Sequence, residues 1–357
     1  MFTKDDTNKI KGIAILLLIF HHMYRTADEI RFMQGKTIIL SDESLSLIAV
    51  CFRICVYIFV FLSAFGMSAG INDKTSIAKN YAYRLWRLLM PYWFTLITVN
   101  VIYFIIFRKF YYINLFFFLG DVIPVLDIVG LPYEMFNGVF WYMNFTLFLV
   151  LIMPFIYELS KRFNVIPLIL IMALYRLIPT VIDSPYGGRY ASYLFAAGLG
   201  VLFQIYKVFD RILERFKSFS IINKIICLIG LLLCAALCPY AGLVFKTGAV
   251  FGVMPMLFTA GGLAVILIGY LFVSHHIIAK PLTFLGQFSY DIFLIHVMVY
   301  RNAVVILRPL RYVILQYIAA VCLCFLAAYV LHLLKKYTGW LKLITVVSNK
   351  IKAAGSD

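Results

Sequence analysis

Lys11 and His22 combine a cation and an imidazole on the first apolar segment of the chain. Eleven positions separate them, and at about 100° and 1.5 Å per residue a helix brings them to within roughly 20° of one face, roughly 16 Å apart. Ile15 and Leu18 complete the stripe between them. This arrangement predicts a charge at a membrane edge above an ionisable group inside the bilayer, which is costly to keep without a function.

The composition excludes an ordinary soluble protein. Of 357 residues, 64% are hydrophobic, 17% aromatic and only 13% charged. Apolar stretches of about 17–25 residues recur from Ile10 to Leu334, each long enough to cross the hydrocarbon layer as a helix. The net charge of +16 does not indicate nucleic acid, because the basic residues gather in the short connections between these stretches, as topology requires.

The pattern predicts an all-α, polytopic integral membrane protein with about ten transmembrane helices. Residues 1–357 form a single membrane-embedded domain, with its helices over 10–334 and a short basic cytoplasmic tail at 335–357. Lys and Arg are more abundant in the connections on the side of the termini, which predicts that both termini are cytoplasmic. Segment 110–130 carries acids around a proline and is expected to be re-entrant or interfacial. The predicted spans are 10–25, 45–69, 88–107, 139–158, 165–182, 190–208, 221–243, 249–273, 284–301 and 313–334.

A second buried histidine is expected at the depth of the first. With cytoplasmic termini, the helices that carry His22 and His296 run in the same direction, and each imidazole falls roughly 18 Å from the cytoplasmic end. Interhelical hydrogen bonding would explain either histidine alone. The matching depth favours a shared functional site.

Arg84 and Arg87 lie three positions apart and therefore on one helical face at the cytoplasmic edge. Two guanidinium groups there could bind phosphate oxygens in bidentate fashion. Simple positive-inside anchoring explains the same spacing.

Two further polar residues are expected inside the second span. Arg53 falls in its outer half and should face a polar cavity or an anionic partner. Asp291 is the nearest acid by sequence region, although its depth of about 10 Å from the cytoplasmic face fits Arg53 poorly. Ser63 lies near the inner third, where a lone serine more often serves helix packing than catalysis. No metal-ligand cluster or phosphate-binding glycine loop is visible in the sequence, so the chemistry rests on His, Arg and Lys.

At these residues the chain resembles acyltransferase family 3, the polytopic membrane acyltransferases that modify bacterial surface polysaccharides. The family's motif of Arg or Lys, ten residues and His falls on Lys11 and His22. Its paired arginines correspond to Arg84 and Arg87, and its aromatic-rich serine motif corresponds to residues 59–65. The remaining family-like positions are Gly286, Ser289, Tyr290, Leu294 and His296, the mid-chain Trp141 with Thr146 where some members have an acid, and the stretch from Arg189 to Gly200.

The resemblance implies a membrane-bound O-acyltransferase, an enzyme transferring groups other than amino-acyl groups, in the bacterial plasma membrane. It implies acetyl-CoA or another acyl-CoA as donor substrate, no metal, and a hydroxyl of a cell-surface or lipid-linked glycan as acceptor, as in exopolysaccharide biosynthesis, with glycan-synthesis proteins as candidate partners. Lys11, Arg84 and Arg87 would bind the donor, with His22, His296 and Arg53 catalytic. Ser63, Trp141, Tyr290, Asp291 and Arg189 would line the substrate cavity.

A transporter or flippase for a glycan intermediate is the alternative, since buried His and Arg also mark transport pathways. The chain shows no convincing internal repeat of the kind found in many transporters.

Overall fold

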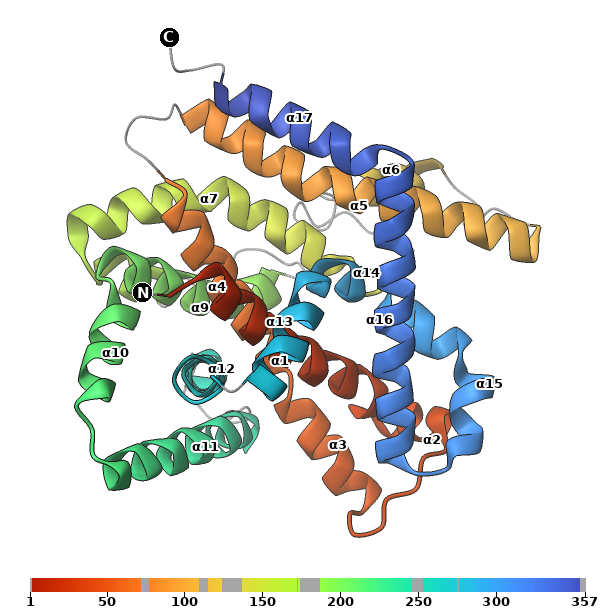
Figure 1. The fold of residues 1–357 in the computed structure, drawn as a ribbon, viewed down its shortest axis with the longest axis horizontal. Coiled ribbons are helices and arrows are strands. Elements are labelled where there is room, and N and C mark those ends of the chain that lie inside the picture. Colours follow the sequence, from red (N-terminus) through yellow and green to blue (C-terminus); the bar gives the residue numbers. More distant parts are fainter. Residues whose placement is uncertain are drawn as a thin grey trace.

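The computed structural model describes residues 2–71, 77–108, 115–123, 137–171, 173, 187–244, 253–274 and 276–353 (Figure 1). Within these residues every regular element is a helix, which confirms the predicted all-α class. The helices are α1 (Lys4–Tyr24), α2 (Ala27–Met33), α3 (Asp42–Cys51), α4 (Ile54–Ala69), α5 (Ile77–Phe107), α6 (Leu115–Val122), α7 (Trp141–Phe163), α9 (Gly187–Ile205), α10 (Val208–Lys217), α11 (Ile221–Val244), α12 (Val253–Leu271), α13 (His276–Gln287), α14 (Ser289–Asn302), α15 (Val304–Leu307), the 3₁₀ turn η2 (Arg308–Leu310), α16 (Val313–Tyr337) and α17 (Trp340–Ala353).

Six helical segments in the described residues are long and apolar enough to cross a membrane, and the number rises to eight if each of two bent helix pairs is one span. A multi-pass membrane protein is therefore supported, whereas the count of about ten spans and the side of the termini are not confirmed. Most of the predicted span 165–182 lies outside the described residues. Within segment 110–130 the described part is α6, whose eight residues are too short to cross the bilayer.

Helix α1 lies at the centre of the molecule and positions Lys11 and His22 (Figure 1). Its start is fixed by a capping box, in which the Thr3 hydroxyl accepts from the Asp6 amide at 3.1 Å and the Thr3 amide donates to the Asp6 carboxylate at 3.0 Å. Ile15 and Leu18 are almost fully buried against the neighbouring helices. The apolar stripe between Lys11 and His22 is thus core packing.

Two glycines allow α1 and α13 to cross with their backbones in direct contact. A Cβ atom on Gly286 would lie 1.7 Å from the Asn8 carbonyl oxygen, and one on Gly12 would lie 2.1 Å from the Leu282 carbonyl oxygen. No side chain larger than hydrogen fits either position without moving a helix backbone. The family-like glycine at 286, in the last turn of α13, therefore sets the distance between α1 and α13.

One predicted span is interrupted and another is confirmed. The span expected at 284–301 is not one straight helix, because α13 and α14 meet at Phe288 with a bend of 77°. The span expected at 45–69 lies within a single candidate span, Asp42–Ala69, in which Phe52 and Arg53 form the junction between α3 and α4.

The residues expected as a basic tail include a packed helix. Lys335 still belongs to α16, and α17 runs beside α5 (Figure 1). The indole N–H of Trp86 donates to the Ile344 carbonyl at 3.2 Å, and that of Trp340 donates to the Met90 carbonyl at 3.0 Å. These bonds fix α17 along the first half of α5.

Candidate active site

The two histidines of the first and fourteenth helices lie against each other. The ring centroids of His22 and His296 are 4.9 Å apart, and His21 lies 5.1 Å from His22 on the other side. The main-chain carbonyl of His22 also accepts from the Tyr300 hydroxyl at 3.0 Å. The structure thus brings together the two imidazoles that the sequence placed at one depth.

The tautomer of His296 follows from its backbone contacts. Its Nδ1 lies 2.8 Å from the Phe293 carbonyl oxygen and 3.2 Å from that of Ile292. Because a carbonyl can only accept, Nδ1 carries the proton, and Nε2 of the neutral ring is then a free base. Nε2 is buried and has no hydrogen-bond partner among the described residues. His296 is therefore held ready to accept a proton.

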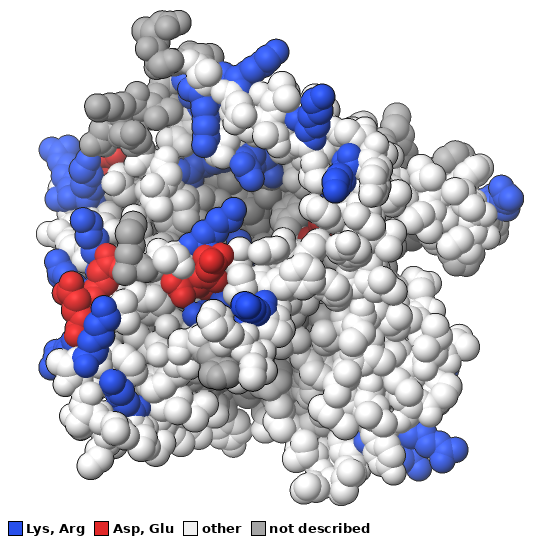
Figure 2. All heavy atoms as spheres, in the orientation of Figure 1, with Lys and Arg blue, Asp and Glu red and all other residues white. Residues whose placement is uncertain are grey.

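A cavity of about 960 Å³ lies at the end of α1 that carries Lys11. Its described lining includes five cations and no carboxylate, the cations being Lys11, Lys79, Arg84, Arg87 and Lys352. Figure 2 shows Lys and Arg side chains around a hollow in this face of the molecule. Within the described residues, Lys11, Arg84, Arg87 and Lys352 form no ion pair with an acid, and like charges that face one cavity repel one another unless an anion enters. The cavity is suited to a polyanionic ligand.

Arg84 is held in place by two of its three nitrogens. Its Nη2 donates to the Met67 carbonyl in the last turn of α4, and its Nε donates to the Asn80 side chain at 3.3 Å. Its Nη1 is buried and has no partner among the described residues. The guanidinium is therefore fixed in position, and its Nη1 can still donate a hydrogen bond.

Tyr83 joins two more of the cavity's cations. Arg87 donates to the Tyr83 hydroxyl at 3.1 Å, and the Lys352 ammonium lies 4.6 Å from the centroid of the same ring. The sequence predicted a span that begins at residue 88, whereas α5 begins at Ile77. Its first three turns therefore carry Lys79, Tyr83, Arg84 and Arg87.

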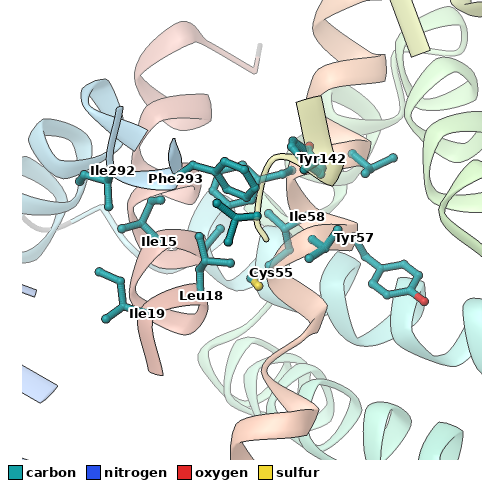
Figure 3. Close-up of a cluster of buried hydrophobic side chains, with 14 of the residues drawn as sticks. Ile15, Leu18, Ile19, Cys55, Tyr57, Ile58, Tyr142, Ile292 and Phe293 are labelled. Carbon is teal, nitrogen blue, oxygen red and sulfur yellow. The ribbon is translucent and has the colours of Figure 1, made fainter. Parts of the chain in front are cut away.

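An aromatic layer separates this cavity from the histidine pair. Phe293 lines the cavity and also lies 6.0 Å from the His296 ring, while Tyr142 packs against Phe293 at 4.8 Å. Figure 3 shows these two side chains clustered with Ile15 and Leu18. Neither His22 nor His296 lines this cavity. Phe293 is thus the residue that lines the cavity and also lies beside the His296 ring.

The substrate-cavity candidates are found in different places. Ser63 and Tyr290 line the cavity, and the Tyr290 hydroxyl donates to the Leu88 carbonyl at 2.8 Å. Trp141 stacks on Tyr193, with ring centroids 5.7 Å apart, and is not among the cavity residues. Arg189 falls on α9, and its side chain lies outside the described residues.

Asp291 is neither in the cavity nor beside Arg53. Its carboxylate forms a buried ion pair with Lys335 on α16, and the two side chains are 11% and 3% exposed. The depth of Asp291 was expected to fit Arg53 poorly, and its partner in the structure is Lys335. The expectation that Asp291 lines the cavity is not met by the described lining.

Arg53 also lies apart from the histidine pair in its contacts. Its guanidinium sits 4.6 Å from the centroid of Phe258, and its Nη2 is 4.0 Å from the Met254 sulfur. Both partners belong to α12. Its Nε is buried and has no hydrogen-bond partner among the described residues, and the catalytic role expected for Arg53 stays a prediction.

Several residues near the site were missed by the sequence reasoning. Lys352 lies on α17, whose apolar residues Trp340, Ile344 and Ile351 recur at helical spacing and could have revealed a packed helix. Glu29 was also missed. It is 8% exposed and pairs with Arg25 at 3.3 Å and with Arg301 at 3.9 Å.

Comparison with known proteins identifies the family. A family described as an acyltransferase domain, acyltransferase family 3, matches residues 8–333, which is nearly the whole chain. A search of curated proteins gave no significant match, and neither did a search of solved structures. The chain belongs to acyltransferase family 3 and is a membrane acyltransferase.

Proposed function

We propose that the protein transfers an acetyl group from cytoplasmic acetyl-CoA to a hydroxyl of a cell-surface or lipid-linked glycan, in the plasma membrane of a bacterium. One observation carries this proposal. A cavity with five cations and no carboxylate in its described lining shares Phe293 with the surroundings of the buried His296, whose ring lies 4.9 Å from that of the half-buried His22.

The basic cavity would receive the nucleotide part of the donor. Coenzyme A carries a diphosphate and a phosphate monoester, and such groups take charge-assisted hydrogen bonds from guanidinium and ammonium donors. Arg84 suits this role because its Nη1 is free and the rest of its guanidinium is fixed. Because the donor is cytoplasmic, this cavity would open to the cytoplasm, in agreement with the basic bias of the terminal side.

The thioester would reach the histidines past Phe293. About eleven residues of helix separate Lys11 from His22, which is roughly 16 Å and comparable to the extended pantetheine arm. The arm would have to displace the Phe293 ring, since this side chain stands between the cavity and His296. Packing of the aromatic layer around the arm would keep water from the thioester.

At the histidine pair, an imidazole would act as general base on the acceptor hydroxyl. The hydroxyl oxygen attacks the thioester carbonyl, the C–S bond breaks, and the proton taken by His22 passes to the departing thiolate. A transient acyl-imidazole on His22 is the second route to the same products.

The backbone contacts of His296 restrict its part. With Nδ1–H donated to main-chain carbonyls, a neutral His296 can accept a proton at Nε2 but cannot donate one there to an oxyanion. We therefore assign His22 the role of general base, with His296 as a neighbouring hydrogen-bond acceptor at Nε2. Stabilisation of the oxyanion would need a different donor.

Two measurements test the proposal together. Surface glycans from producing cells should gain the mass of an acetyl group relative to cells without the protein, and the purified protein should release CoA thiol from acetyl-CoA when a glycan acceptor is present. Movement of a glycan across vesicles without consumption of acyl-CoA would contradict the proposal and would indicate a transporter.

A further inference from the structure

Helix α17 contributes to the lining of the basic cavity although it lies beyond the residues that match the family. The match ends at residue 333, and α17 begins at Trp340. Two residues of its last turn, Ile351 and Lys352, line the cavity. A ligand that fills this cavity would lie beside α17, a helix outside the residues that match the family.

The position of α17 is fixed by packing. Besides its indole bonds to α5, it buries Ile344 and Ser348, which are 8% and 3% exposed. These contacts leave little freedom for the helix to swing away from α5. Lys352 is therefore presented to the cavity by a docked helix rather than by a loose terminus.

Lys352 and Arg87 meet at one side chain. The Lys352 ammonium is 4.6 Å from the Tyr83 ring centroid, and the Arg87 guanidinium carbon is 5.6 Å from it. No ion pair joins either cation to an acid within the described residues. Two neighbouring positive charges repel each other in this arrangement, and a phosphate group placed between them would remove the repulsion.

We propose that α17 is part of the phosphate-binding site and that Lys352, together with Arg87, binds a phosphate of the nucleotide donor. This inference rests on the proposed function, since it assumes that the cavity receives coenzyme A. It assigns to α17 a share in selecting a polyphosphorylated donor over an uncharged thioester.

The test compares Lys352→Gln with Lys350→Gln in the full-length protein. Lys350 is exposed on the same helix and does not line the cavity, so its replacement removes the same charge elsewhere. Binding of CoA and of pantetheine, which lacks the phosphates, is measured in nanodiscs of neutral lipid. We expect Lys352→Gln to weaken CoA binding about two- to fivefold at low salt, as for an exposed ion pair, with pantetheine unaffected. Lys352→Arg should bind CoA as the wild type does.

Each other outcome overturns a different statement. If the wild type binds CoA and Lys352→Gln behaves like Lys350→Gln, the role of α17 is wrong and the proposed function stands. If the wild type does not bind CoA, the proposed function fails and the inference fails with it. An anionic lipid headgroup offers the same phosphate chemistry. If Lys352→Gln changes only the retention of phosphatidylglycerol, measured by native mass spectrometry, the occupant is a lipid and not the donor.

Discussion

Arg84→Gln should raise the donor KM far more than it lowers kcat. The variant removes one charged donor from a guanidinium that is already fixed by Asn80 and the carbonyl of Met67. A hydrogen bond to a charged group contributes about 1.5–3 kcal/mol. At about 1.4 kcal/mol for each factor of ten, the donor KM should rise about 10- to 150-fold.

The separation of KM from kcat follows from where the contact is made. A phosphate group is bound equally in the ground state and in the transition state, so its loss affects binding rather than the chemical step. The assay is initial-rate release of CoA thiol at varied acetyl-CoA, with Arg162→Gln as the matched control. Arg162 is exposed at the end of α7 and does not line the cavity. An unchanged KM in Arg84→Gln, or a fall in kcat at constant KM, would refute the assignment of Arg84 to the donor phosphates.

Three further predictions concern the frame around the site. Gly286→Ala should cost about 1–3 kcal/mol of stability, because the added Cβ would meet the α1 backbone. Gly230→Ala, which has open space around it, should be neutral or stabilising. Thermal unfolding in detergent compares the two variants. Lys335→Met should destabilise the protein by about 3–5 kcal/mol, because it leaves the Asp291 carboxylate buried without a partner. Adding Asp291→Asn should recover most of this loss. A double-mutant cycle on the free energy of unfolding measures the coupling of the two residues. Phe293→Leu should raise acceptor-independent hydrolysis of the donor by opening the aromatic layer; an unchanged rate of thiol release would show that this layer does not guard the thioester.

The parts of the site that could be predicted from sequence are those fixed by local spacing. Helical periodicity put Lys11 and His22 on one stripe of α1, and counting along two parallel segments put His296 at the depth of His22. Arg84 and Arg87 share a face for the same reason. These inferences need only a regular helix over a short stretch.

The parts that failed depend on where helices bend and dock. The predicted straight span over 284–301 did not allow for the 77° bend at Phe288, although Gly286 lies two residues before it, and the pairing of Asp291 with Lys335 was missed. Arg53 contacts Phe258 and Met254 on α12, and Met254 lies 201 positions away in the chain, so local spacing could not identify these partners. The contribution of Lys352 depends on the packing of α17 against α5, between residues 250 and 258 positions apart in the chain.

The central claim is that His22 performs the acyl transfer, and its neighbour provides the control. His21 is the next residue in α1 and is 6% exposed. Its Nδ1 is hydrogen-bonded to the Ala49 carbonyl at 2.6 Å, so this imidazole matches His22 in type and position along α1 but is held by a backbone contact. The measurement is transfer of labelled acetyl groups from acetyl-CoA in membranes that contain equal amounts of His22→Gln or His21→Gln. The rate of acetyl transfer should fall about 10²–10⁴-fold in His22→Gln, as for removal of a general base, and should be retained in His21→Gln. Transfer by His22→Gln at the wild-type rate would contradict the central claim.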